Sequence, residues 1–245
     1  MIPFGPELWL QDGPAVTGAG GFRFPTRMAV VRLPDGAGLW IWSPVALTDA
    51  LRDDLAALGE VRALVAPNSL HHSFLADWAR AFPEATVHAA PGLSAETAGT
   101  PLHATLGDTA PPAWHGALEQ VLVPGNRITT EVIFFHRPSA TVLVTDLVQQ
   151  IPGDWYRGWR ALVARLDRMS GPAPAVPRKF RLAMRDRTAA RAAIGRVLDW
   201  PARQLVMAHG PALSQGGGEA LRDAFRWLAQ APGRHAKGGP SGPPS

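Results

Sequence analysis

The feature that most constrains the fold is a regular alternation of short apolar strands and amphipathic helices in the first half of the chain. Strands are expected at 39–42, 61–66 and 85–90, with helices at 48–59 and 74–82 between them. A strand–helix–strand–helix–strand order implies parallel strands with the helices as crossover connections. The sequence therefore predicts an α/β fold in which helices cover a buried sheet.

Further strands are expected on both sides of this segment. Residues 28–33 and 39–42 flank a turn at 35–38, a pattern that favours an antiparallel hairpin. Strand patterns return in the second half of the chain at 120–123, 131–135, 141–145 and 205–208. Two β-rich stretches, each followed by strands and helices, indicate two sheets in a layered sandwich.

Helical patterns follow the later strands, at 188–198 and 221–228. A third pattern places Trp155, Trp159, Leu162, Leu166 and Met169 at helical spacing. We interpret this apolar face as core or as cover for a sheet. The alternative is a face that touches a membrane, with arginines on its other side at 157, 160, 165 and 168.

The 245 residues, 46% of them apolar, suffice for one large domain with a substantial core. We expect a single domain over 1–230. Residues 231–245 hold four Gly and four Pro, a composition that favours a disordered tail. No apolar run approaches the roughly 20 residues of a membrane span, and the N-terminus has no pattern of a secretory signal. We therefore expect a cytoplasmic protein.

The charge is unevenly distributed. Between Arg157 and Arg203 there are twelve basic residues and three acidic ones, although the net charge of the whole chain is only +4. Such a local excess predicts an anionic partner at this surface, unless it is an ordinary solvated helix surface. The chain contains no Cys, which excludes a thiolate metal site and a cysteine nucleophile.

Polar groups cluster where four of the expected strands end. They are Asn68 to His72, Gly125 with Asn126, Asp146, and His209 with Gly210. Ligand sites of open α/β sheets gather at the carboxyl ends of strands. Histidine and carboxylate side chains are ligands that zinc and iron use, so these clusters indicate a metal centre.

In these stretches the sequence resembles the metallo-β-lactamase superfamily. There a strand ends in His-x-His-x-Asp-His, a later Pro-Gly-His adds a histidine, another strand ends in a bridging Asp, and the last ends in His-Gly. The corresponding stretches here are APNSLHHSFLADW (66–78), VPGN (123–126), LVTDLV (143–148) and VMAHGP (206–211). The resemblance implies a four-layer αββα sandwich.

The chain is more similar still to an uncharacterised branch of that superfamily, a domain of unknown function. This similarity is carried by FPTRMAVVRL (24–33), SPVALT (43–48), APNSLHH (66–72), FFHRPSATVLVTDL (134–147) and MAHG (207–210).

The sequence departs from the superfamily pattern at one of the two metal sites. With His72 in the last position of the motif, Pro67 and Ser69 replace two histidines, and Asn126 replaces the histidine of Pro-Gly-His. In the superfamily those three histidines bind one metal. The positions of the second metal hold His71, His72, Asp146 and His209.

A shifted register, with Asn68 in the first position, would place His72 at the Asp position and Ser73 at the last histidine. The sequence leaves both registers open.

The resemblance implies a metal-dependent hydrolase of a small-molecule substrate with a reduced, mononuclear site. One Zn or Fe ion would be held by His71, His72, Asp146 and His209. Asp146 would also orient the attacking water, and Asn68 and Asn126 would donate hydrogen bonds to a substrate oxygen.

The alternative is a non-catalytic binding or scaffold module that has lost its metal and keeps these residues as a hydrogen-bonded network. Glu131 and His136 are further polar residues of the strand region whose roles stay open.

Overall fold

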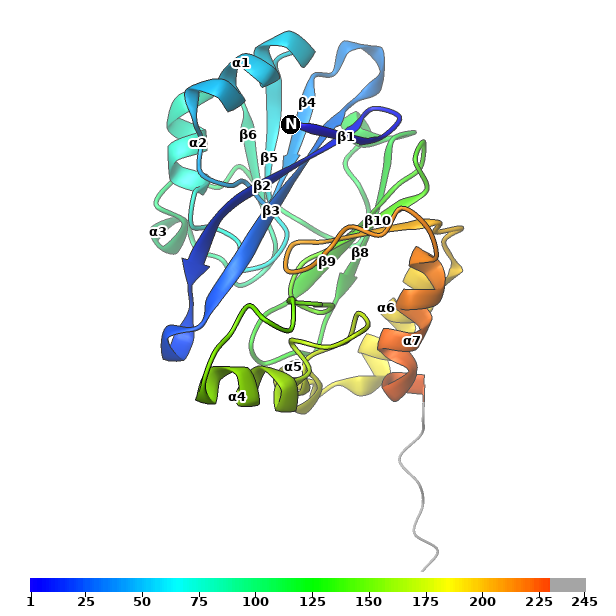
Figure 1. Cartoon of the computed structure of the whole chain (residues 1–245). Coiled ribbons are helices and arrows are strands. Elements are labelled where there is room, and N and C mark those ends of the chain that lie inside the picture. Colours follow the sequence, from blue (N-terminus) through cyan, green and yellow to red (C-terminus); the bar gives the residue numbers. More distant parts are fainter. Residues whose placement is uncertain (230–245) are drawn as a thin grey trace, which may run out of the picture.

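The computed structural model describes residues 1–229, which contain two β-sheets (Figure 1). One sheet has seven strands in the order of the sequence: β1 (Ile2–Gly5), β2 (Leu8–Thr17), β3 (Arg23–Arg32), β4 (Leu39–Trp42), β5 (Val61–Ala66), β6 (Thr86–Ala89) and β7 (Ala104–Thr105). The other has the order β11-β10-β9-β8, formed by β8 (Leu118–Val123), β9 (Glu131–His136), β10 (Thr141–Val144) and β11 (Gln204–Met207). The expected tail at 231–245 lies outside the described residues.

The predicted parallel unit is confirmed. Strands β4, β5 and β6 pair in parallel, and the crossovers contain α1 (Asp49–Leu58) and α2 (Leu75–Ala81). The hydroxyl of Thr48 accepts a hydrogen bond from Leu51 N at 3.2 Å, which caps α1 where the sequence predicts its start. The predicted hairpin is also present, since β3 pairs antiparallel with β4. Strands β9 and β10 form a further antiparallel pair.

Three apolar cores separate four layers. Trp40, Trp42 and Phe134 lie between the two sheets. Leu55 and Trp78 join α1 and α2 to the outer face of the seven-stranded sheet. The outer face of the other sheet is covered by α6 (Arg187–Asp199) and α7 (Gly217–Ala229), again through an apolar core. The molecule is therefore a four-layer αββα sandwich, which confirms the predicted fold class.

Some elements differ from the prediction. Strand β3 begins at Arg23 rather than at residue 28; it pairs antiparallel with β2, with a register shift between Gly13 and Val16. Two short helices occupy segments where none is expected, α3 (Ala95–Ala98) and α5 (Arg178–Ala183).

The expected helix over 155–169 is shorter, α4 (Trp159–Asp167). It begins after Gly158, which has a φ of 59°, and ends at Arg168, which has a φ of 63°. Most of its apolar face is not core: Trp159, Leu162 and Leu166 are 57%, 60% and 55% exposed, so the interpretation is wrong for these residues. Met169, the last residue of the pattern, is buried in a small apolar cluster. The side that packs inward is instead made of small residues, such as Ala164.

In the part of the chain from residue 1 to 229, no helix is both long and apolar enough to cross a bilayer.

Candidate metal site

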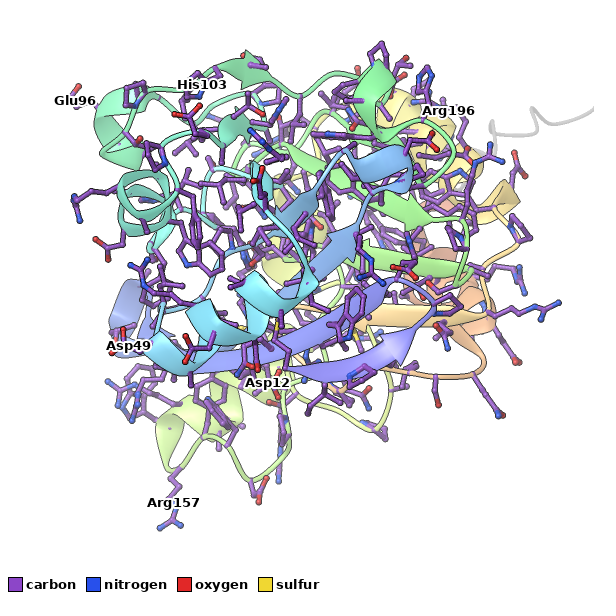
Figure 2. The ribbon with its side chains drawn as sticks, turned by 90° about the horizontal axis from the view of Figure 1, so that it is seen from above. Asp12, Asp49, Glu96, His103, Arg157 and Arg196 are labelled. Carbon is purple, nitrogen blue, oxygen red and sulfur yellow. The ribbon has the colours of Figure 1, made fainter. Side chains whose placement is uncertain are left out.

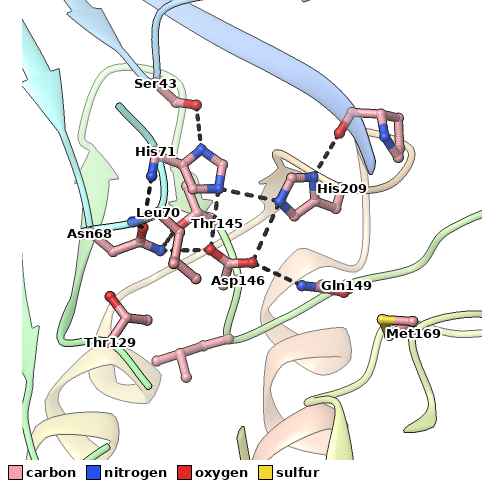
Figure 3. Close-up of polar contacts among 12 residues, drawn as sticks. Ser43, Asn68, Leu70, His71, Thr129, Thr145, Asp146, Gln149, Met169 and His209 are labelled. Carbon is pink, nitrogen blue, oxygen red and sulfur yellow. Dashed lines mark hydrogen bonds and ion pairs between the residues drawn. The ribbon is translucent and has the colours of Figure 1, made fainter. Parts of the chain in front are cut away.

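Three side chains from different parts of the sequence meet at the carboxyl ends of β5, β10 and β11 (Figure 3). His71 Nε2 lies 3.2 Å from His209 Nε2 and 3.3 Å from Asp146 Oδ2. His209 Nε2 lies 3.5 Å from Asp146 Oδ1. The two imidazoles and the carboxylate therefore point at one centre, although 138 positions separate the histidines in sequence.

The contact of His209 with the β2–β3 hairpin fixes its tautomer. His209 Nδ1 lies 2.6 Å from the carbonyl oxygen of Pro25, which can only accept a hydrogen bond. Nδ1 therefore carries the proton, and in a neutral ring Nε2 presents a lone pair to Asp146 and His71. A histidine held in this way by a carbonyl is typical of metal ligands.

His71 is oriented in a similar way. Its Nδ1 lies 2.8 Å from the hydroxyl of Ser43, which can donate or accept. Burial lowers the pKa of His71, although the carboxylate of Asp146 acts to raise it. A neutral His71 carries one ring proton, either on Nδ1 facing Ser43 or on Nε2 facing His209 and Asp146.

Asp146 supplies the negative charge of the cluster. Burial acts to raise the pKa of its carboxyl, but hydrogen bonds and charge from His209 and His71 hold that pKa well below its ordinary value. The carboxylate also accepts hydrogen bonds from Asn68 Nδ2 at 2.8 Å and Gln149 Nε2 at 3.1 Å. An ionised carboxylate therefore lies within 3.5 Å of two imidazole nitrogens in a buried place, and a shared proton or a metal cation between them would satisfy this arrangement.

Asn68 connects the chain after β5 to the end of β10. Its side-chain carbonyl accepts from Leu70 N at 2.8 Å and His71 N at 3.1 Å, and this turn directs His71 toward the centre. Its amide donates to Asp146 and to Thr145 Oγ1 at 2.9 Å. The side chain is fully buried, so its amide holds Asp146 in position.

Glu131 supports the same turn from below. Its carboxylate accepts from the backbone N–H groups of Thr145, Asp146 and Leu147 at 2.7, 2.9 and 3.1 Å. Burial and the charge of Asp146 raise the pKa of Glu131 to about 7. The sequence draws attention to Glu131 without a role; the structure places it under the loop that carries Asp146.

A pocket of about 750 Å³ opens over the side chains of His71, Asp146 and His209. Its wall is largely apolar and includes Phe22, Phe24 and Phe180. Of the charged wall residues, Lys179 lies 3.3 Å from Asp167 and so is already paired. The pocket gives a substrate of moderate size access to the centre.

His72 and Asn126 take different places. His72 lines the pocket and is half-buried, and burial lowers its pKa, but it is not one of the three converging ligands. Asn126 donates to the carbonyl of Phe180 at 2.9 Å and accepts from Ile128 N at 2.9 Å, which ties the end of β8 to α5.

Three supporting groups are not found by sequence reasoning: Ser43, the carbonyl of Pro25, and Gln149. Pro25 and Ser43 lie in stretches that carry the family similarity, and Gln149 lies three positions after Asp146, but none of these signals assigns a role. Gly210 is the glycine of the His-Gly pair after β11. A Cβ at this position would lie 3.0 Å from the carbonyl oxygen of Gln150. The chain therefore needs glycine where it passes the loop after β10.

A family model described as "Domain of unknown function (DUF4336)" matches residues 15–157. The chain belongs to this family. No curated protein matches it.

Solved structures match over most of the chain and share the metallo-β-lactamase fold. A metallo-β-lactamase from Erythrobacter litoralis is 16% identical with a TM-score of 0.59, covering 90% of this chain and 93% of its own. FIM-1 from Pseudomonas aeruginosa in its mono-zinc form is 13% identical with a TM-score of 0.58, covering 91% of each chain. The Flv1 flavodiiron core from Synechocystis is 13% identical with a TM-score of 0.56, covering 91% of this chain and 62% of its own. This likeness shows the fold, and the match to a domain of unknown function confirms the predicted similarity to an uncharacterised family of that fold.

Proposed function

We propose that this DUF4336 protein is a hydrolase with one metal ion held by His71, Asp146 and His209. The observation that carries the proposal is the convergence of two imidazoles on a buried, ionised carboxylate, with His209 Nδ1 occupied by a carbonyl. Without a cation or a shared proton, the lone pairs of the imidazole nitrogens would repel the carboxylate of Asp146.

The spacing of the donor atoms fits a tetrahedral metal. Metal–ligand distances of about 2.0–2.1 Å place tetrahedral donors about 3.3 Å apart. The observed separations of 3.2, 3.3 and 3.5 Å agree with this value. Three protein ligands leave one position open, as is typical of catalytic rather than structural sites.

A Zn²⁺ or Fe²⁺ ion bound there would lower the pKa of a coordinated water toward about 7 and so supply hydroxide at neutral pH. Both metals are compatible with imidazole and carboxylate ligands. The mono-zinc form of FIM-1 and the flavodiiron core of Flv1 support the choice of zinc or iron in this fold.

The residues of the chain would divide the remaining work. Asp146 and the two histidines would hold the ion, while Asn68 and Glu131 keep Asp146 in position. His72 faces the pocket with a lowered pKa, so its neutral ring could accept a proton from the attacking water. Ligation by His72 as a fourth ligand stays a prediction, as do the roles of Asn68 and Asn126 as hydrogen-bond donors to a substrate.

The pocket favours a substrate with an apolar group. Phe22, Phe24 and Phe74 line it beside the candidate centre. An ester, thioester or amide with an aromatic or aliphatic substituent would bury that substituent against these rings. Cleavage of octanoyl esters should therefore exceed cleavage of acetyl esters.

Elemental analysis of the protein purified without chelator tests the proposal. We expect about one equivalent of Zn or Fe, lost in His209→Ala and Asp146→Ala, with ester hydrolysis lost in the same variants. His103→Ala is the matched control, because His103 lies outside the cluster and its ring accepts from Val87 N. Metal-free wild type that stays unloaded after incubation with Zn²⁺ or Fe²⁺ would refute the proposal.

A non-catalytic module is the second candidate, favoured by the hydrogen bonds that already engage the remaining motif positions. Ser69 Oγ lies 2.9 Å from Thr129 Oγ1, and the amide of Asn126 is held by Phe180. A module of this kind would keep its cellular function in His71→Ala and His209→Ala.

A further inference from the structure

The exposed apolar side chains of this protein gather around one part of its surface. Of nine large apolar residues exposed within 1–229, only Ile2 lies elsewhere. Leu70, Ile128 and Val163 line the pocket described above. The other five belong to the segment 155–182: Trp155, Trp159, Leu162, Leu166 and Leu182.

Helix α4 provides the centre of this surface. Trp159, Leu162, Val163 and Leu166 follow the i, i+3, i+4, i+7 spacing of a single helix face, and all four are at least 38% exposed. Ala164, on the inward side, is fully buried. The apolar face therefore points away from the protein, and contiguous exposed patches of this kind mark interaction surfaces.

The helix is anchored beside the pocket mouth rather than detached from the molecule. Arg160 donates to the carbonyl of Gly20 at the tip of the β2–β3 hairpin, at 3.3 Å. The ring of Trp159 packs edge-on against Phe22, with centroids 5.6 Å apart, and Phe22 also lines the pocket. In Figure 1 the helix lies below the hairpin tip, at the end of the molecule opposite β1.

Strong positive charge surrounds the apolar face. Residues 157–185 contain eight basic side chains and one acidic side chain, Asp167, which lies 3.3 Å from Lys179. Arg157, Arg165 and Arg168 are exposed on or next to α4. Figure 2 shows Arg157 at the edge of the molecule, directed away from the body of the protein.

We propose that the apolar face of α4, with its flanking arginines and the pocket rim, docks on an anionic lipid bilayer. Helices that lie in a membrane interface combine an exposed apolar face containing Trp and Leu with flanking basic residues. Basic side chains near an anionic leaflet add attraction that salt weakens. Docking requires no metal, so it stands or falls independently of the hydrolase proposal.

The charge pattern favours this occupant over two others. A second copy of the chain would bring two surfaces with the same positive excess together, which like-charge repulsion opposes. Nucleic acid would use the arginines, but it gives no role to the aliphatic side chains of Leu162, Val163 and Leu166. A bilayer uses both the apolar and the basic groups.

Co-sedimentation of the full chain with vesicles tests the proposal. With equimolar phosphatidylcholine and phosphatidylglycerol we expect binding at least about tenfold tighter than with phosphatidylcholine alone, and weakened by salt. The fluorescence of Trp159 should be quenched by brominated acyl chains, and this quenching should fall in Trp159→Phe.

Two double variants separate the apolar and electrostatic parts. Leu162→Ser with Leu166→Ser, and Arg165→Glu with Arg168→Glu, should each weaken binding about tenfold or more. Ile2→Ser is the matched control, because Ile2 is equally apolar and 69% exposed but lies on β1. Circular dichroism and thermal unfolding check that all variants stay folded.

Three outcomes would overturn the proposal. One is equal affinity of the wild type for neutral and anionic vesicles, or no binding to either. Another is that the wild type self-associates but does not bind vesicles, and that the double variant Leu162→Ser with Leu166→Ser no longer self-associates. The third is binding to a mixed-sequence RNA without binding to vesicles.

Discussion

The two ends of the four-stranded sheet hold buried histidines in contrasting settings. At one end, His209 faces His71 and the carboxylate of Asp146. At the other end, His136 is fully buried with Nδ1 2.7 Å from the hydroxyl of Ser139, and the charge of Glu7 acts to raise its pKa. Strand β9 spans both settings, since it begins at Glu131 and ends at His136.

The contrast shows what makes a cation site here. Burial lowers the pKa of His136 to about 4, against the charge of Glu7, and lowers the pKa of His71 against the carboxylate of Asp146, so burial favours the neutral imidazole at both ends. Only the end with Asp146 adds an ionised carboxylate aimed at the rings. At the other end the hydroxyls of Ser139 and Thr141 lie 2.7 Å apart and continue to Gln204, a chain of neutral hydrogen bonds.

The largest effect is expected for Glu131→Ala. This change leaves the backbone N–H groups of Thr145, Asp146 and Leu147 without their acceptor in a buried place, at a cost of about 3–5 kcal/mol. Urea unfolding measures the loss. Gln204→Ala is the control at the opposite end, where one neutral hydrogen bond is lost and about 1 kcal/mol is expected. Equal losses of unfolding free energy in the two variants would show that Glu131 does not stabilise the loop after β10 more than an ordinary hydrogen bond does.

The next effect is stabilisation by metal. Free Zn²⁺ at about one hundred times its dissociation constant should raise the free energy of unfolding by about 2.7 kcal/mol. His209→Ala should abolish this gain, because a converging ligand is lost, whereas His136→Asn should keep it. Thermal unfolding with and without chelator provides the measurement. A gain that survives in His209→Ala would place the ion elsewhere.

The fold could be predicted where local pattern and packing agree. The apolar strands at 39–42 and 61–66 and the helix capped by Thr48 are readable because burial and hydrogen bonding select the same residues. The outer part of the β2–β3 hairpin could not be predicted, since its pairing depends on the partner strand rather than on an alternation of apolar and polar residues. For α4, apolar spacing indicates a helix but cannot say which surface it faces.

The candidate site shows a similar division. His71, Asp146 and His209 could be proposed because each follows a strand, and the carboxyl ends of strands gather at one edge. The orientation of the two histidine rings could not be predicted, because it depends on Ser43, which follows β4, and on Pro25, which lies in the β2–β3 hairpin. A sequence carries no local signal for a backbone carbonyl that selects a tautomer.

A smaller effect is expected for Asn126→Ala at the edge strand of the same end. The change removes the bonds to Phe180 and Ile128, so we expect a loss of about 1–2 kcal/mol in urea unfolding. Metal content should stay at the wild-type level, because Asn126 touches none of the three ligands. Metal loss in this variant would show that the edge strand belongs to the site. Thr86→Ala, which removes the exposed hydrogen bonds of one hydroxyl to the carbonyl of Arg62 and to His88 Nε2, gives a reference for a minor change.

The smallest effect concerns pH at the far end of β9. His136 has a folded pKa of about 4 against an ordinary value of 6.5, because burial disfavours its charged form. Below pH 6.5 the unfolded chain binds a proton that the folded chain refuses, so stability falls as pH drops from 6.5 toward 4. His136→Asn, which can keep the bond to Ser139, should lessen that fall by about 1 kcal/mol between about pH 7 and 5.5. Urea unfolding at several pH values measures the difference. If the dependence of the free energy of unfolding on pH is the same in His136→Asn and in the wild type, His136 is protonated in the folded protein as readily as in the unfolded chain. The two ends of the sheet would then differ less in electrostatics than their hydrogen bonds indicate.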